Sequence, residues 1–131
     1  MTTIERANYA KELKGRGKCN CAQAVISALY DLTDTDLNTL LASTSGFAVG
    51  MGTMEATCGA LIGANIILGL IVKQGTVKYS KILYNKFKEL SKATICKVIK
   101  GIDTGIVLTA CDMCCYNAVI ALLDLLDEIN N

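Results

Sequence analysis

The sequence predicts an all-α, single-domain helical bundle of five to seven helices with one central apolar helix. The 131-residue chain contains no proline, which proteins built of strands and turns commonly use in their turns. Apolar residues recur at the i, i+3 and i+4 spacing of a helix face in most segments. The stretch from Ala60 to Val72 is apolar on nearly all sides, as expected for a helix surrounded by others. The length indicates one domain, residues 1–131, large enough to bury a real core.

The first half of the chain is expected to form three helices. Thr2 and Glu5 have the spacing of a capping box at the start of the first helix. The second helix opens at Asn20, with Gln23 three residues later, and runs for about three turns. A third, short helix covers residues 37–41.

The second half of the chain is expected to hold the longer helices, separated by glycine-containing loops. Residues 101–109 are interpreted as a loop, with a short strand at 106–108 as the alternative. The helices are expected at residues 56–73, 76–90, 96–99 and 112–129.

Composition excludes several classes of function. The net charge is +1, only 19% of residues are charged, and five Tyr and two Phe are too few for a base-stacking surface, so nucleic-acid binding is not expected. The longest apolar stretch, 60–72, is too short to span a bilayer and contains Asn65. The amino terminus lacks a basic segment followed by an apolar run, so a cytoplasmic location is expected, where thiols usually stay reduced.

Cysteine is the residue type that indicates chemistry. The chain has seven cysteines and no histidine, which removes the commonest general base and metal ligand. The chemistry is therefore expected to be that of thiolates, either metal–sulfur binding or thiol–disulfide exchange. An inert packing role for some of these residues is the alternative, because free cysteine behaves as a small apolar residue. The cysteines are Cys19, Cys21, Cys58, Cys96, Cys111, Cys114 and Cys115.

The spacing of the cysteines brings some sulfurs together locally. Cys19 and Cys21 form a C-x-C pair, and Cys111 to Cys114 form a C-x-x-C segment followed at once by Cys115. On a helix, spacings of three and four residues place sulfurs on one face, where two thiolates can bind one metal centre or form one disulfide. The paired C-x-x-C units of a zinc ribbon and the ferredoxin spacing are both absent. The ligands of any cluster are therefore expected to come from separate helices.

Cys58 has the strongest physical case for reactivity. It follows a glycine-rich loop that includes Gly50 and Gly52, and it precedes the apolar helix, whose amino terminus would stabilise a thiolate. Gly59 and Gly63 lie one turn apart on that helix. They indicate either a tight contact between helices or room for a cofactor, and the four glycines are candidate cofactor-binding residues.

Several segments together resemble the redox-active protein family named for its C…GCAxxG…C…C cysteine pattern. The segments are Asn20-Cys21-Ala22-Gln23-Ala24-Val25, Ser45-Gly46-Phe47-Ala48-Val49-Gly50-Met51-Gly52, Cys58-Gly59-Ala60-Leu61-Ile62-Gly63, Cys96-Lys97-Val98-Ile99-Lys100-Gly101 and Cys115-Tyr116-Asn117-Ala118-Val119. The resemblance implies a small helical protein with a redox role and four core cysteines, here Cys21, Cys58, Cys96 and Cys115. The fold also resembles the helical part of split-Soret cytochromes, but no haem-attachment motif and no histidine are present.

The function expected from the sequence is redox chemistry at an iron–sulfur cluster held by cysteine thiolates, for electron transfer or reduction of a small substrate. All seven cysteines are candidate ligands. A metal-free dithiol–disulfide oxidoreductase, with Cys58 as the attacking thiolate, is the first alternative. A protein that binds zinc or another soft metal without redox turnover is the second. The expected partners are a redox protein or a small molecule, together with a second copy of the chain in a homodimer.

Overall fold

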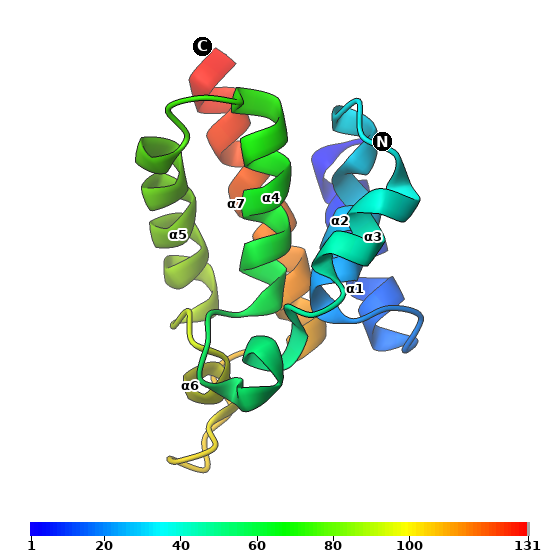
Figure 1. The fold of residues 1–131 in the computed structure, drawn as a ribbon. Coiled ribbons are helices and arrows are strands. Elements are labelled where there is room, and N and C mark those ends of the chain that lie inside the picture. Colours follow the sequence, from blue (N-terminus) through cyan, green and yellow to red (C-terminus); the bar gives the residue numbers. More distant parts are fainter. Residues whose placement is uncertain (131) are drawn as a thin grey trace.

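The computed structural model describes residues 1–130, which contain seven α-helices and one 3-10 turn (Figure 1). The all-α class predicted from the sequence is confirmed, with eight helical elements in place of the predicted five to seven. In chain order they are α1 (Thr3–Gly15), α2 (Cys21–Leu29), the 3-10 turn η1 (Tyr30–Leu32), α3 (Leu37–Thr44), α4 (Gly59–Val72), α5 (Val77–Ser91), α6 (Cys96–Lys100) and α7 (Cys111–Asn130).

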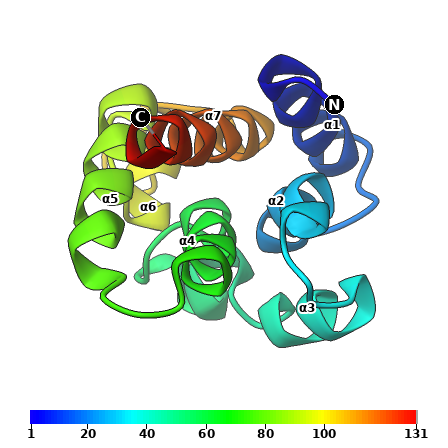
Figure 2. The ribbon, with the colours of Figure 1, turned by 90° about the horizontal axis from the view of Figure 1, so that it is seen from above.

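Helices α4 and α7 hold the bundle together. The longest helix, α7, contacts α1, α2, α4 and α5, while α4 packs against α2, α5 and α7. Seen from above, α3 lies outside α2, which is the one helix that it contacts extensively (Figure 2). The core contains fully buried side chains such as Phe87, Ile26, Ile67 and Leu122. Burial of each such side chain contributes about 1.5–3 kcal/mol. Within residues 1–130, no helix combines the length and the apolar character needed to cross a membrane.

Two helices begin with the capping boxes that the sequence predicts. The Thr2 hydroxyl accepts the Glu5 N–H at 3.1 Å, and the Glu5 carboxylate accepts the Thr2 N–H at 2.8 Å. At the start of α2, Asn20 and Gln23 exchange the equivalent pair of hydrogen bonds. Each box satisfies backbone donors that have no partner inside the helix.

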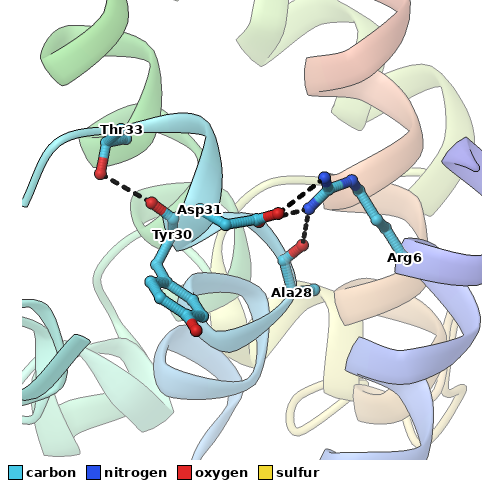
Figure 3. Close-up of polar contacts among 5 residues, drawn as sticks. All are labelled: Arg6, Ala28, Tyr30, Asp31 and Thr33. Atoms are coloured by element: carbon cyan, nitrogen blue, oxygen red, sulfur yellow. Dashed lines mark hydrogen bonds and ion pairs between the residues drawn. The ribbon is translucent and has the colours of Figure 1, made fainter. Parts of the chain in front are cut away.

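Arg6 ties α1 to the end of α2 (Figure 3). One guanidinium nitrogen donates to the Ala28 carbonyl at 2.8 Å, and two donate to the Asp31 carboxylate at 2.6 and 3.0 Å. The hydrogen bond from Arg6 lowers the pKa of Asp31. Arg6 therefore provides a donor to a carbonyl at the carboxyl end of α2 and joins that end of α2 to α1. The figure also shows the Thr33 hydroxyl donating to the Tyr30 carbonyl at 2.8 Å.

Helix α4 begins three residues later than the sequence predicts, at Gly59 rather than Ala56. Thr57 instead pairs with Ile95 in an isolated antiparallel bridge. The Cys58 N–H donates to the Thr94 carbonyl at 2.7 Å, and the Cys96 N–H donates to the Ala56 carbonyl at 3.1 Å. Because these bonds hold residues 56–58 in an extended conformation, they bring the starts of α4 and α6 side by side.

The loop before α4 contains a left-handed turn. Four consecutive residues have positive φ angles: Val49 (55°), Gly50 (55°), Met51 (56°) and Gly52 (77°). For residues other than glycine this conformation costs roughly 1–2 kcal/mol each, so surrounding contacts must hold Val49 and Met51 in place.

The segment 101–110 forms turns, and no strand is present in residues 1–130, so the strand alternative for 106–108 is wrong. The left-handed residue Gly101 ends α6, as predicted. The Leu108 N–H donates to the Ile99 carbonyl at 2.8 Å, which folds the segment back onto α6.

Candidate functional site

Four helix starts converge on a cavity of about 60 Å³ at one end of the bundle. Cysteine occupies each start. Cys21, Cys96 and Cys111 are the first residues of α2, α6 and α7, and Cys58 is the N-cap of α4. With Cys114, one turn further along α7, these side chains line the cavity. Backbone N–H groups at helix amino termini carry partial positive charge, so their convergence favours anions such as thiolates.

Cys58 is the thiol that this environment activates. The Cys114 thiol donates a hydrogen bond to the Cys58 sulfur, the Ala60 and Leu61 amides donate to it from the first turn of α4, and the Lys100 ammonium adds favourable charge. Together these groups outweigh the opposing effect of burial and lower the pKa of Cys58 to about 7. The reactivity predicted for Cys58 therefore has a physical basis in the structure.

Cys114 is the partner of Cys58. The pKa of Cys114 is raised because its proton is held in the hydrogen bond to Cys58, and because the side chain is only 2% exposed. The pair thus shares one proton, with a thiolate at Cys58 and a thiol at Cys114. In this state the Cys58 thiolate is the nucleophile. The Cys114 sulfur can then attack a disulfide bond that Cys58 has formed.

Cys21 and Cys96 also line the cavity. Burial raises the pKa of both thiols. The Cys21 sulfur accepts a hydrogen bond from the Val49 amide, which belongs to the left-handed turn. Gly50 lies against Cys96, since a Cβ atom at Gly50 would be 3.0 Å from the Cys96 Cβ. The strained turn therefore rests directly on two cysteines.

The remaining cysteines do not line this cavity. Cys115 is fully buried, and its thiol donates to the Cys21 carbonyl at 3.6 Å, while burial raises its pKa. Cys19 is half-buried in the segment before α2. The resemblance implied Cys115 as the fourth core cysteine, whereas the cavity is lined by its neighbour Cys114. Within residues 1–130, no three Cys, Asp or Glu side chains are arranged to bind a single metal ion.

Two lysines that no sequence motif marks also line the cavity, Lys14 near the end of α1 and Lys100 at the end of α6. The charge of Lys100 favours a thiolate on Cys58. Its position four residues after Cys96, one turn along the same helix, is the signal that could have identified it. No comparable signal marks Lys14.

The four candidate glycines have different surroundings. Gly59 lines the cavity, and a Cβ atom there would be 2.7 Å from the Cys21 sulfur. Gly63 makes a tight contact between α4 and α2, because a Cβ atom would be 2.8 Å from the Ala22 carbonyl oxygen. Gly50 packs on Cys96, whereas a Cβ atom at Gly52 would meet no neighbouring atom within 4 Å.

The comparison with protein families is decisive for the identity of the chain. Residues 19–129 match the family described as "Putative redox-active protein (C_GCAxxG_C_C)". The chain belongs to the C_GCAxxG_C_C family. The match covers the starts of α2, α4, α6 and α7, and so includes all the cysteines of the cavity. No curated protein sequence and no solved structure matches the chain significantly.

Proposed function

We propose that this member of the C_GCAxxG_C_C family is a dithiol–disulfide oxidoreductase in which Cys58 and Cys114 are the redox couple. One observation carries the proposal: Cys58, the N-cap of α4, and Cys114, in the first turn of α7, line the same small cavity, where the interaction with Cys114 lowers the pKa of Cys58 to about 7. Family membership supports a redox role, and the geometry favours an exchange between two neighbouring sulfurs.

The proposed reaction reduces a small disulfide, R–S–S–R. The Cys58 thiolate attacks one sulfur, forms a Cys58–S–S–R mixed disulfide and expels RS⁻. Cys114 then attacks the Cys58 sulfur, the Cys58–Cys114 bond forms, and the second RS⁻ leaves with the Cys114 proton as RSH. Two protein thiols are oxidised and one external disulfide is reduced, so the electrons balance.

The surroundings of the pair suit both steps. The Ala60 and Leu61 amides stabilise negative charge on Cys58 before the attack and whenever Cys58 is the leaving group. Lys14 and Lys100 offset the negative charge that accumulates when thiolates leave. A cavity of about 60 Å³ favours a small substrate over a folded protein at Cys58 itself.

Free-thiol titration after exposure to hydroxyethyl disulfide tests the proposal. The reduced protein should lose two thiols per chain, and Cys58→Ser should stay folded and form no bridge to Cys114. Cys114→Ser should trap the mixed disulfide on Cys58. Cys19→Ser is the matched control and should behave as wild type, because Cys19 lies outside the cavity. If Cys58→Ser still lost two thiols as fast as wild type, the assignment of Cys58 as the attacking thiolate would be refuted.

An iron–sulfur cluster is the second candidate, favoured by the five cysteine sulfurs around one cavity. Cys21, Cys58, Cys96 and Cys114, with Cys111 as an alternative, are its candidate ligands by their thiolate chemistry and their origin on separate helices, but within residues 1–130 no three of them are arranged to bind a single ion. A bound cluster would supply one-electron transfer. The positive helix termini and the two lysines would offset the charge of the thiolate ligands. Protein purified without air should then be brown and contain iron and acid-labile sulfide, whereas colourless protein that takes up neither on reconstitution would exclude this candidate.

A redox partner protein and a homodimer remain predictions. Three side chains on one side of α4, Ile62, Ile66 and Leu70, are only partly buried. This apolar surface supports the proposed dimer. Sedimentation at micromolar concentration distinguishes a monomer from a dimer, and a single 14.0 kDa species would exclude dimerisation.

A further inference from the structure

Cys111 differs from the other cysteines of the cavity in its access to solvent. The four others are at most 9% exposed, with Cys58 at 7% and Cys114 at 2%. Cys111 is only half-buried, although it lines the same cavity. A large reactant approaching from solvent therefore meets Cys111 before it can reach the proposed redox couple.

Cys111 is also placed to exchange with that couple. It is the first residue of α7 and lies one turn before Cys114, so its sulfur and that of Cys114 are on the same face of the helix. Lys100, Cys111 and Cys114 all line the same cavity.

We infer that Cys111 is the exchange thiol of the protein, which carries the disulfide from the buried Cys58–Cys114 couple to a protein dithiol at the surface. The inference rests on the proposed function, because it needs a Cys58–Cys114 bridge to act on. It assigns the C-x-x-C segment a role distinct from that of Cys58.

The exchange balances without any further reactant. The Cys111 thiolate attacks the Cys114 sulfur of the Cys58–Cys114 bridge, a Cys111–Cys114 bond forms, and Cys58 leaves as the thiolate that the α4 amides stabilise. A thiolate of the partner dithiol attacks the Cys111 sulfur and releases Cys114. The second partner thiol then attacks the mixed disulfide and releases Cys111, so the protein is reduced and the partner is oxidised.

The surface beside Cys111 suits a protein partner. The segment just before α7 exposes Ile102 (58%), Ile106 (64%) and Val107 (63%). Neighbouring exposed apolar side chains are typical of surfaces that contact other proteins. A partner that packs on this segment would present its dithiol to Cys111 rather than to Cys58, which lies deeper.

The test compares wild type with Cys111→Ser and uses Cys19→Ser as the matched control. Cys19 is also half-buried but lies outside the cavity. Each protein is oxidised with hydroxyethyl disulfide and then reduced either by a thioredoxin-type protein dithiol or by dithiothreitol. Cys111→Ser should slow reduction by the protein about tenfold or more, and reduction by dithiothreitol less than about threefold, because access limits only the large reductant. Cys19→Ser should match wild type with both.

The sequence makes the two disulfides easy to distinguish by mass. No lysine or arginine occurs in 19–72 or after Lys100, so trypsin leaves Cys58 in fragment 19–73 and both Cys111 and Cys114 in fragment 101–131. A Cys58–Cys114 bridge joins the two fragments, whereas a Cys111–Cys114 bridge lies within the second. Further cleavage of fragment 101–131 on the amino side of Asp112 then places Cys111 and Cys114 on separate peptides.

Oxidised wild type should contain the bridge within fragment 101–131, and Cys111→Ser should accumulate the cross-linked fragments. If Cys111→Ser is cross-linked but is reduced by the protein dithiol as fast as wild type, the role of Cys111 is refuted while the proposed function stands. If no cross-linked fragments form in Cys111→Ser, the Cys58–Cys114 couple itself is refuted. The disulfide map of the wild-type protein does not depend on any substitution. If it showed only the cross-linked fragments, the inference would be overturned even if Cys111→Ser failed to fold.

Discussion

Replacing Gly59 with alanine tests how closely the cavity wall is packed. A Cβ atom on Gly59 would be 2.7 Å from the Cys21 sulfur, 2.9 Å from the Phe47 carbonyl oxygen and 3.1 Å from the Ala48 Cα. Two of these three neighbours are backbone atoms, which cannot move aside as a flexible side chain can. The loop before the left-handed turn, or the start of α2, must therefore shift.

The expected change in the free energy of unfolding of Gly59→Ala is the balance of two opposing effects. Overpacking at a rigid site costs about 1–3 kcal/mol, and the better helix propensity of alanine offsets at most about 1 kcal/mol of that cost. We expect Gly59→Ala to lower the free energy of unfolding by about 1–2 kcal/mol. The shift of Cys21 and of the loop should also change the rate at which Cys58 reacts.

Gly69→Ala is the matched control on the same helix. A Cβ atom there would meet no neighbouring atom within 4 Å, so only the propensity and the entropy of the unfolded chain change. This variant should be more stable by about 0.5–1 kcal/mol. Urea unfolding measures both variants. If Gly59→Ala proved as stable as Gly69→Ala, the close packing of Gly59 on the cysteine wall would be refuted.

Three further predictions concern single side chains. Arg6→Met should lower the free energy of unfolding by about 2–3 kcal/mol, because it leaves the Ala28 carbonyl without its donor and Asp31 without its cation; urea unfolding with no loss of stability would contradict this. The rate of Cys58 alkylation by iodoacetamide should rise with pH around a midpoint of about 7, since the thiolate is the reactive form; a midpoint above 8 would exclude the activated thiol. The same lowered pKa means that the thiolate's contribution to stability is fully present above the ordinary thiol pKa and is lost as the pH falls through 7. Lys86→Ala should change stability by less than about 1 kcal/mol, because its two carboxylate partners on α7 are more than half exposed; a larger effect that persists in high salt would contradict this.

The features that the sequence predicts correctly depend on local chemistry. The capping boxes at Thr2 and Asn20 act within one turn of their own helix, and Gly101 ends α6 through its own left-handed conformation. The position of Cys58 at a helix start also follows from neighbours along the chain. For such features the spacing of residue types contains the necessary information.

The features that the sequence does not predict depend on contacts between distant segments. The late start of α4 results from the bridge between Thr57 and Ile95. Cys114 and Cys115 are adjacent, and the packing of α7 against α2 decides which of them faces the cavity. Lys14 reaches the same cavity only because α1 packs against α7.

The long separation of Cys58 and Cys114 along the chain links the redox state to the lifetime of the protein. A bridge between them closes a loop of residues 58–114, which includes all of α4, α5 and α6. By the entropy that such a loop removes from the unfolded chain, the form bridged between Cys58 and Cys114 would be more stable by about 4 kcal/mol, less any strain in the bridge, whereas transfer of the bridge to Cys111 and Cys114 closes only a short loop and stabilises less. Unfolded chains are the ones that cellular proteases degrade, so their population would fall on oxidation and rise on reduction. A change in the redox balance of the cell would then alter the turnover of this protein as well as its activity.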